Sequence, residues 1–524
     1  MLLHEMVEFA AQRAPGTVAL VHGAASVTFA DLARRVERVA AALQEVTVPG
    51  DRVALLSENT AEFIDLYYAA PKAGLVLTPL NYRLHPEEWA ALLAHAEPTV
   101  LVGERALLDH VLPLRGQFPS VETVVATDEQ AVGEVPYGEL LASDRQFEPP
   151  VGQRDSDVAW ILYTSGTTGR PKGAMLTHAS LFAAVMATAV ARPVEATDVY
   201  LFPFPLCHVA GYNVLLFHLN ARPVVLLRRF DVGEVLTAIE EHAVTNISLA
   251  PTMISMILDD PRLDATDLSS LRSVGYGASG IPAPVLRRGL ERLGCDFAQG
   301  FGMTELSGNA AFLDAETHRR GVAGEEHLLR AAGRPGPLVS IRVVDDDLVD
   351  VPVGEVGEIV VRGDQVTAGY WRDEAATEEA FAGGWFHTGD LGRFDEEGFL
   401  SIVDRKKDVI VTGGENVASR EVEDVLHLHP GVKEAAVVGV PDEHWGDVVC
   451  AVVVPRDGVA VEPDDLVELC RAHLAGFKKP RHVVFVDELP KNTSGKILKH
   501  QLRALVPSLV EGGGAAVEDG AAVS

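Results

Sequence analysis

Short apolar runs alternate with amphipathic helical patterns along most of this chain, and this alternation limits the folds open to it. Residues 33–46 have the spacing of an amphipathic helix, and residues 51–57 have the pattern of a strand. A second helix and strand follow at 62–74 and 75–80, and the same order returns between residues 223 and 277. Strands that alternate with helices favour layered structure with parallel sheets. We therefore expect an α/β fold.

The pattern changes after about residue 340, where short strand-like runs are separated by glycines and charged turns. Residues 404–408 form a charged run between two such strands, and a charged run of this kind is most often a solvated turn. The following ~100 residues have the pattern of a compact domain. Because 524 residues exceed what one hydrophobic core holds, we expect two domains or more.

The charge of the chain restricts its partners. Lys and Arg number 44 against 75 Asp and Glu, so the net charge is 44 − 75 = −31. Such a surface repels nucleic acid and anionic membranes. An anionic substrate would need a local cationic pocket or a metal ion, because the overall field opposes it.

Cysteine usage and the N-terminus indicate a cytoplasmic protein. The four cysteines include no CxxC pair, which favours reduced thiols over a disulfide framework or zinc site. Glu5 and Glu8 lie where a signal peptide needs an apolar run. The longest apolar stretch, about 181–191, is too short to span a bilayer.

The most informative segment is 163–173, YTSGTTGRPKG, which follows a strand-like run. Its glycines let backbone N–H groups turn toward an anion, its hydroxyls donate hydrogen bonds, and Lys172 supplies positive charge. It is not a Walker A loop, because no GK[ST] follows at the required spacing. The pattern predicts a phosphate-binding loop, with a polar surface loop as the plainer alternative.

Residues 275–280, GYGASG, match the GxGxxG pattern, and Asp296 lies near the spacing of a ribose-binding acid. Taken alone, this match favours a nucleotide-binding oxidoreductase. It is a weak match because it lies deep in the chain. Pro282 and Pro284 also lack the free N–H groups that a Rossmann helix offers to pyrophosphate.

Three further segments carry polar groups on glycine-rich turns. In 299–305, QGFGMTE, Phe301 could stack on a base, Thr304 could contact a phosphate and Glu305 could hold magnesium. Asp390 ends WFHTGD and could accept both ribose hydroxyls, although turns often carry an Asp. Lys496 lies in LPKNTSGKI, and most exposed lysines are only solvated.

Together these segments resemble, in order and spacing, the adenylate-forming superfamily of acyl-CoA synthetases, adenylation domains and beetle luciferases. The resemblance runs from about Thr28 to about Leu502 and is closest to acyl-CoA synthetases of the fatty-acid or aryl type. The motifs that carry it are YTSGTTGRPKG, GFGMTE, WFHTGD, VDRKKDVIVTGGENV and LPKNTSGKILK.

The resemblance implies a domain division. It gives an ATP- and acyl-binding N-terminal domain at 1–403 and a hinge at 404–408 with Lys407 at its pivot. A mobile α+β C-terminal domain would occupy 409–510, and we expect the Gly- and Ala-rich tail 511–524 to be disordered.

The resemblance also implies a set of site residues. Catalytic roles fall on Lys496, Thr304, Glu305 and His208, and Glu305 would bind the metal. Nucleotide contacts fall on Thr164, Ser165, Gly166, Thr167, Thr168, Gly169, Lys172, Gly277, Ala278, Ser279, Gly300, Phe301, Gly302, Asp390 and Arg405. The acyl pocket would use Val209, Ala210, Gly211, Tyr212, Tyr276 and Met303, and Gly413 and Gly414 would face the thiol.

The implied cofactors are ATP, Mg²⁺ and coenzyme A as acyl acceptor. The implied activity is formation of an acyl-AMP with release of pyrophosphate, followed by acyl transfer to coenzyme A. Residues 208–211 contain no acid to bind an ammonium group, which favours an apolar carboxylic acid over an amino acid. Residues 418–420, Ala-Ser-Arg, depart from the family pattern near the thiol-facing side, so delivery to a carrier protein or another acceptor stays open. A binding-only relative is a further alternative, opposed by the intact Lys496, Glu305 and Asp390.

Overall fold

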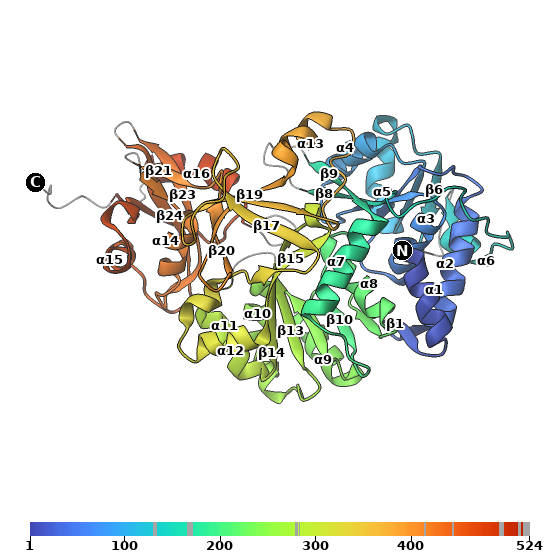
Figure 1. The fold of residues 1–524 in the computed structure, drawn as a ribbon, viewed down its shortest axis with the longest axis horizontal. Helices are drawn as coiled ribbons and strands as arrows, with labels where there is room; N and C mark the ends of the chain where they lie inside the picture. The colour runs from blue at the N-terminus through green and yellow to red at the C-terminus, as the bar shows by residue number, and fades with distance from the viewer. Residues whose placement is uncertain are drawn as a thin grey trace, which may run out of the picture. The chain divides into compact units, whose positions relative to one another are not determined.

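The computed structural model describes residues 1–128, 134–164, 171–277, 281, 283–412, 415–442, 445–491, 497–511 and 515–516. The chain forms two compact units. Unit 1 comprises Met1–Gly280, Arg287–Ile341 and Val361–Phe386, and unit 2 comprises Ile281–Leu286, Arg342–Val360 and His387–Ser524. Figure 1 shows the elements of each unit along the colour ramp. The division at 403 and 404 that the resemblance implies remains a prediction.

One sheet of unit 1 has seven strands in the order β7-β6-β5-β3-β4-β8-β9. All neighbours are parallel except the terminal pair β8 and β9, which is antiparallel. The strands are β3 (Arg52–Leu56), β4 (Val76–Leu80), β5 (Val100–Gly103), β6 (Thr123–Ala126), β7 (Val135–Pro136), β8 (Val158–Thr164) and β9 (Lys172–Thr177).

The other large sheet has nine strands in the order β16-β15-β14-β13-β12-β10-β11-β1-β2. Its centre is parallel, and antiparallel pairs close both ends. The strands are β1 (Val18–His22), β2 (Ala25–Thr28), β10 (Tyr200–Phe202), β11 (Val224–Leu226), β12 (Asn246–Leu249), β13 (Ser273–Gly277), β14 (Asp296–Met303), β15 (Gly308–Leu313) and β16 (Arg334–Pro335).

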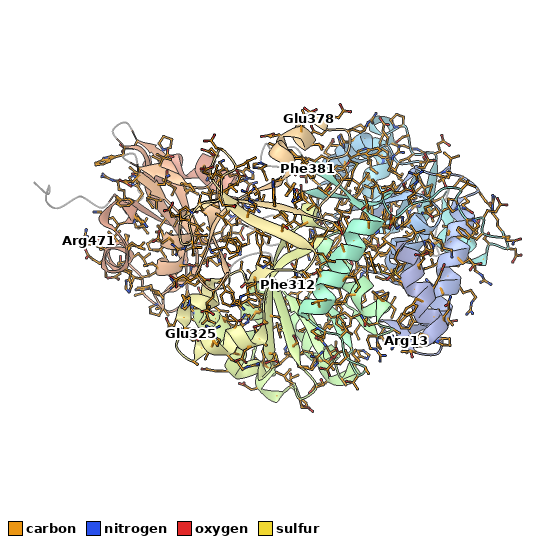
Figure 2. The ribbon with its side chains drawn as sticks, viewed as in Figure 1. Arg13, Phe312, Glu325, Glu378, Phe381 and Arg471 are labelled. Carbon is orange, nitrogen blue, oxygen red and sulfur yellow. The ribbon has the colours of Figure 1, made fainter. Side chains whose placement is uncertain are left out.

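Among the helices that contribute to a hydrophobic core shared with both large sheets are α1 (Leu3–Arg13), α2 (Phe29–Leu43), α3 (Ala61–Lys72), α7 (His178–Ala191) and α8 (Tyr212–Leu219). Helix α2 shows why these segments are helical. Its N-cap Thr28 accepts a hydrogen bond from the Asp31 N–H, and its buried side chains recur at spacings of three and four. Figure 2 shows the side chains that fill the spaces between the elements.

The other helices of unit 1 are 6 to 11 residues long, and two of them, at 137–142 and 374–380, add buried residues to the same core. They are α4 (Pro86–Ala96), α5 (Arg105–Val111), α6 (Tyr137–Ala142), α9 (Val232–His242), α10 (Pro251–Asp259), α11 (Ala283–Leu293, of which 283–286 belong to unit 2), α12 (Ala315–Val322) and α13 (Glu374–Ala380). Short 3-10 turns at Val209–Gly211 (η2) and Thr304–Leu306 (η4) carry predicted site residues.

A third sheet, mostly in unit 2, has the order β17-β18-β19-β20, with β17 (Val339–Val344), β18 (Gly357–Gly363), β19 (Phe386–Phe394) and β20 (Leu400–Arg405). The last sheet joins β22-β21-β24-β25-β26, and β23 pairs with β24. Its strands and helices are β21 (Ile410–Thr412), β22 (Glu415–Val417), β23 (Val432–Asp442), β24 (Gly446–Pro455), β25 (His482–Phe485), β26 (Ala515–Ala516), α14 (Ser419–Leu426), α15 (Pro463–His473) and α16 (Lys499–Glu511).

The α/β class and the large and small sheet-containing parts confirm the fold predicted from sequence. The alternation read at 33–80 corresponds to α2, β3, α3 and β4. Among the described residues, no helix is long and apolar enough to cross a membrane. Most of the tail predicted to be disordered lies outside the described residues.

Candidate active site

The two ends of the predicted phosphate loop are adjacent strand residues. Thr164 ends β8, Lys172 begins β9, and the two are register partners. The Thr164 hydroxyl lies 3.4 Å from the Lys172 carbonyl oxygen. The predicted residues between them, Ser165, Gly166, Thr167, Thr168 and Gly169, lie outside the described part of the chain. The pairing of β8 with β9 therefore holds Thr164 and Lys172 next to each other, on either side of the predicted phosphate loop.

A buried carboxylate lies against this hairpin. Glu305 sits in η4, and only 8% of its surface is exposed. Its Oε1 accepts hydrogen bonds from the hydroxyls of Tyr370, at 3.1 Å, and Thr164, at 3.4 Å. Burial, and secondarily the Glu305 carboxylate, raise the pKa of Tyr370 far above its ordinary value, so the phenol stays protonated and donates. This pairing holds Glu305 in place before any ligand arrives.

Tyr370 reaches this position because residues 368–371 run along β9, the terminal strand of its sheet. The Met175 N–H donates to the Gly369 carbonyl, and the Trp371 N–H donates to the Gly173 carbonyl. The Lys172 ammonium lies 5.0 Å from the centre of the Tyr370 ring, a cation–π distance. Sequence reasoning missed Tyr370, because a pairing across about 200 residues leaves no local pattern.

Strands β13 and β14 place the second group of predicted nucleotide contacts. Gly277 and Gly300 are parallel register partners, and a Cβ on Gly277 would come within 2.6 Å of the Gly300 carbonyl oxygen. Only glycine permits that approach. Phe301, Gly302 and Met303 continue β14, and Thr304 follows, all partly exposed. Ala278 and Ser279 lie outside the described residues.

The register of β13 and β14 argues against a dinucleotide-binding fingerprint. Asp296 pairs with Ser273, so it lies at the amino end of these parallel strands, while Gly277 lies at the carboxyl end. Asp296 is exposed and pairs with Arg319 at 2.6 Å. A ribose-binding acid would need to lie at the carboxyl ends, close to the glycine turn.

The predicted acyl-side histidine has an enclosed, unsatisfied ring nitrogen. No described residue hydrogen-bonds Nε2 of His208. Burial, and then the nearby Arg83 charge, lower the pKa of His208 to about 4, so the ring is neutral at physiological pH. The segment before it is held by Asn59, whose side chain donates to the Phe204 carbonyl and accepts from the Leu206 N–H.

The predicted acyl-pocket residues lie in different settings. Val209 and Ala210 are partly exposed in η2, and Gly211 is buried. Tyr212 is 2% exposed, and its hydroxyl accepts hydrogen bonds from Thr188 and Asn309 at 3.1 and 3.0 Å. The Tyr276 hydroxyl lies 2.8 Å from Nε2 of His318, on α12. Both tyrosine hydroxyls therefore have protein partners.

In unit 2, the two predicted ribose contacts meet across a strand pair. Asp390 of β19 and Arg405 of β20 are register partners, and their side chains form a 2.6 Å ion pair. Asp390 is 4% exposed, and its N–H donates to the Thr388 hydroxyl. The preceding residue within β19, Gly389, has a φ of +68°, a conformation that favours glycine.

The predicted hinge segment is bonded within unit 2 at both ends. Asp404 accepts hydrogen bonds from the N–H and the hydroxyl of Ser419, and Asp408 pairs with Arg503 at 2.8 Å. Lys407 lies exposed between them. Ser419, part of the stretch that departs from the family pattern, is therefore a buried structural partner of Asp404. Gly413 and Gly414 lie outside the described residues.

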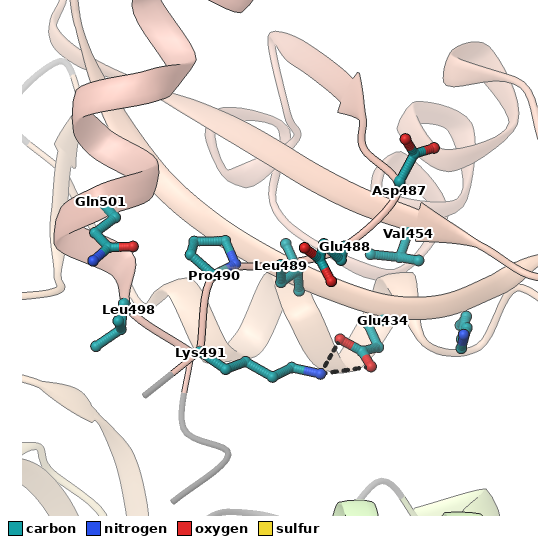
Figure 3. Close-up of a pocket in the computed structure, with 10 residues that line it drawn as sticks. Glu434, Val454, Asp487, Glu488, Leu489, Pro490, Lys491, Leu498 and Gln501 are labelled. Atoms are coloured by element: carbon teal, nitrogen blue, oxygen red, sulfur yellow. Dashed lines mark hydrogen bonds and ion pairs between the residues drawn. The ribbon is translucent and has the colours of Figure 1, made fainter. Parts of the chain in front are cut away.

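Lys496 also lies outside the described residues. The start of its motif borders a hollow of about 620 Å³ in unit 2, lined by residues of β23, β24, the 487–491 segment and α16 (Figure 3). Lys491 lies at its rim and pairs with Glu434 at 2.6 Å. The charge of Lys491 is thus already compensated.

The chain is similar to known proteins over nearly its whole length. The family described as AMP-binding enzyme matches residues 7–371, and the AMP-binding enzyme C-terminal domain matches 421–496. Feruloyl-CoA synthase from Amycolatopsis sp is 40% identical over 94% of this chain and 96% of that protein. Fatty acid–[acyl-carrier-protein] ligase ScoC from Streptomyces coeruleorubidus is 36% identical over 96% of each chain. The structure of amide bond synthetase McbA from Marinactinospora thermotolerans aligns with a TM-score of 0.87 at 34% identity, over 96% of this chain and 99% of that one.

Proposed function

This chain belongs to the AMP-binding enzyme family, and from that premise we propose that it converts a carboxylic acid and ATP to an acyl-adenylate and pyrophosphate. The acyl group then passes to the thiol of coenzyme A, with release of AMP. The observation that carries the proposal is the buried Glu305, held by Tyr370 and Thr164 beside Lys172 at the ends of the 165–170 segment. Family membership and the register of β13 and β14 both argue against the dinucleotide-binding oxidoreductase that the GxGxxG match favoured.

The adenylation step brings a carboxylate to the α-phosphorus, so two anions must approach each other. Positive charge has to be supplied where negative charge develops. Lys172 and Lys496 are the protein groups we assign to this task. Asp390 and Arg405 are assigned to the ribose, where a carboxylate accepts hydrogen bonds from hydroxyl groups.

Glu305 and Thr164 suit a magnesium ion. Their side chains offer carboxylate and hydroxyl oxygens close to each other, the donor class that Mg²⁺ prefers. A bound Mg²⁺ would neutralise phosphate charge. We assign Glu305 as its protein ligand and Tyr370 as the residue that orients the carboxylate.

His208 is assigned to the substrate carboxylate. Because its ring is neutral, it orients the acid through a hydrogen bond rather than through charge. The absence of an acidic side chain in 208–211 favours acids without an amino group. We propose a mostly apolar aliphatic or aromatic acid as substrate.

Thioester formation needs a different set of groups around the same acyl carbonyl. We propose that the chain between 409 and 510 moves about 404–408, with Lys407 at the pivot, so that Gly413 and Gly414 face the thiol. A carrier protein or another acceptor is the second candidate. ScoC and McbA are named for acceptors other than coenzyme A, and Ser419 stands in a stretch that departs from the family pattern.

ATP–pyrophosphate exchange over a panel of acids tests the proposal. Exchange that depends on an acid and on magnesium supports adenylation. No exchange with any acid, or ADP as nucleotide product, contradicts it. Adding coenzyme A or a pantetheinylated carrier protein to the active acid then decides between the two acceptors.

A further inference from the structure

Arg192 lies against one face of the nine-stranded sheet. It follows the last residue of α7, and its N–H donates to the Thr188 carbonyl at 2.7 Å. Its guanidinium contacts Gly275 of β13 so closely that a Cβ at this position would collide with Nη1. Gly275 is the register partner of Ser248, whose hydroxyl accepts from Tyr200 on the same face.

The positive charge of Arg192 has no partner in the described part of the chain. No hydrogen bond or ion pair of its guanidinium is found there. The charged side chains that influence the pKa of Arg192 are Asp198 and Arg272. These two side chains form an ion pair with each other at 2.6 Å. Asp198 also accepts from the Thr245 hydroxyl. The nearby carboxylate is therefore already engaged.

Arg192 is partly exposed to solvent, although protein atoms surround most of its side chain. Its side chain keeps some accessible surface, yet burial is the largest effect on its pKa and lowers it. An arginine stays cationic even so. A cation enclosed by protein without a counter-charge is unfavourable in the free enzyme, and a ligand oxygen would relieve that cost.

The position of Arg192 along β13 is consistent with a contact to the end of the substrate opposite its reacting carboxylate. Gly275 precedes Gly277 by two residues, or about 7 Å along the strand at roughly 3.3 Å per residue. Gly277 lies at the carboxyl end of β13 and pairs with Gly300, and both are predicted nucleotide contacts. Tyr212 is near enough to Arg192 to influence its pKa, and it follows His208 by four residues in the chain. An acid bound at this end of β13 with its body directed back along the strand would point toward the guanidinium.

We propose that Arg192 binds a hydrogen-bond-accepting oxygen at the end of the acyl substrate opposite the reacting carboxylate. The substrate class is then an acid with an apolar body and a distal oxygen, either a phenol or ether, or a second carboxylate. This inference rests on the proposed function and sharpens it. Arg192 is a specificity residue, distant from the reacting atoms.

The test uses three acids with one carbon skeleton: cinnamate, 4-hydroxycinnamate and 4-carboxycinnamate. Acid-dependent ATP–pyrophosphate exchange gives kcat/KM for each with the full-length enzyme. We expect at least one oxygen-bearing acid to exceed cinnamate by about tenfold or more, the discrimination of one charge-assisted hydrogen bond. Which of the two wins distinguishes a neutral oxygen from a carboxylate.

Two variants and a control complete the test. Arg192→Met should bring the kcat/KM values of the three acids to within about threefold of one another, mainly by lowering the values of the oxygen-bearing acids, because the distal contact is lost. Gly275→Ala is a second test, which is needed if Arg192→Met fails to fold. Its Cβ displaces the same guanidinium, so the preference for oxygen-bearing acids should fall. Arg319→Met removes a paired cation of α12, whose partner Asp296 lies at the amino end of β14, and should keep the preference.

The outcomes separate this inference from the proposed function. Exchange with cinnamate but no preference in the parent enzyme overturns the role of Arg192 alone. An equal loss for all three acids in Arg192→Met and Gly275→Ala overturns it as well, because it shows a structural role. No exchange with any acid overturns both proposals.

Discussion

The proposed nucleotide side and the proposed acyl side differ in how their polar groups are satisfied. On the nucleotide side, Glu305 accepts hydrogen bonds from two hydroxyls, and Asp390 pairs with Arg405. On the acyl side, the hydroxyls of Tyr212 and Tyr276 have protein partners. Nε2 of His208 and the guanidinium of Arg192 have none among the described residues. The contrast suggests that the protein holds the nucleotide-binding groups in place by itself. In our proposal, the acid would complete the bonding of His208 and Arg192.

The largest effect should come from removing a cation on the nucleotide side. Lys496→Ala should slow adenylate formation by about 3 kcal/mol or more, by analogy with lost oxyanion donors. A synthetic acyl-adenylate bypasses that step, so thioester formation from it should survive. Single-turnover rates of the two half-reactions measure this. Lys491→Ala is the matched control, because Lys491 already pairs with Glu434. An equal loss of both half-reactions would contradict the assignment.

Asp390→Ala should weaken ATP use by about 2 kcal/mol, because it removes a charge-assisted contact and leaves Arg405 unpaired. The KM for ATP should rise while the KM for the acid changes little. Asp395→Ala, in the turn after β19, is a control in the same sheet. An unchanged KM for ATP would show that Asp390 only holds Arg405.

Tyr370→Phe should have a smaller effect, about 1 kcal/mol, since Glu305 keeps its hydrogen bond from Thr164. The loss should appear in the apparent KM for magnesium–ATP and not in the KM for the acid. A matched control is Tyr137→Phe, whose hydroxyl donates to Asp65 in another part of the core. A loss shared equally by both substrates would mean that Tyr370 only supports the fold.

The smallest expected effect concerns pH: the KM for the acid should stay constant across the range in which an ordinary histidine titrates. Burial lowers the pKa of His208 to about 4, so the neutral ring persists above that pH and protonation sets in only as the pH falls toward it. The KM for the acid should therefore show no inflection between about pH 5.5 and 8, where an ordinary histidine titrates. An inflection near pH 6.5 that His208→Gln removes would show a charged, solvated ring. The exposed His110, replaced by Gln, is the control.

The features that could be predicted from the sequence are those that depend on residues close together in the chain. The helix and strand order at 33–80 and 223–277 follows from apolar spacing, and the glycine at 277 follows from a motif. Contacts across long separations were not predictable. Tyr370 meets Glu305 only because residues 368–371 pair with β9. Arg192 looks like an ordinary polar residue at the end of a helix, and its missing partner is visible only once β13 packs against it.

Isotope transfer tests the central claim, adenylation of the acid, most directly. The enzyme is given ATP, coenzyme A and an active acid whose carboxyl oxygens are ¹⁸O. If a carboxylate oxygen attacks the α-phosphorus, that oxygen stays on phosphorus when the thiol takes the acyl carbon. Mass spectrometry should then find a single ¹⁸O in the phosphate of AMP at each turnover. Unlabelled AMP, or ¹⁸O in inorganic phosphate together with ADP, would contradict the account.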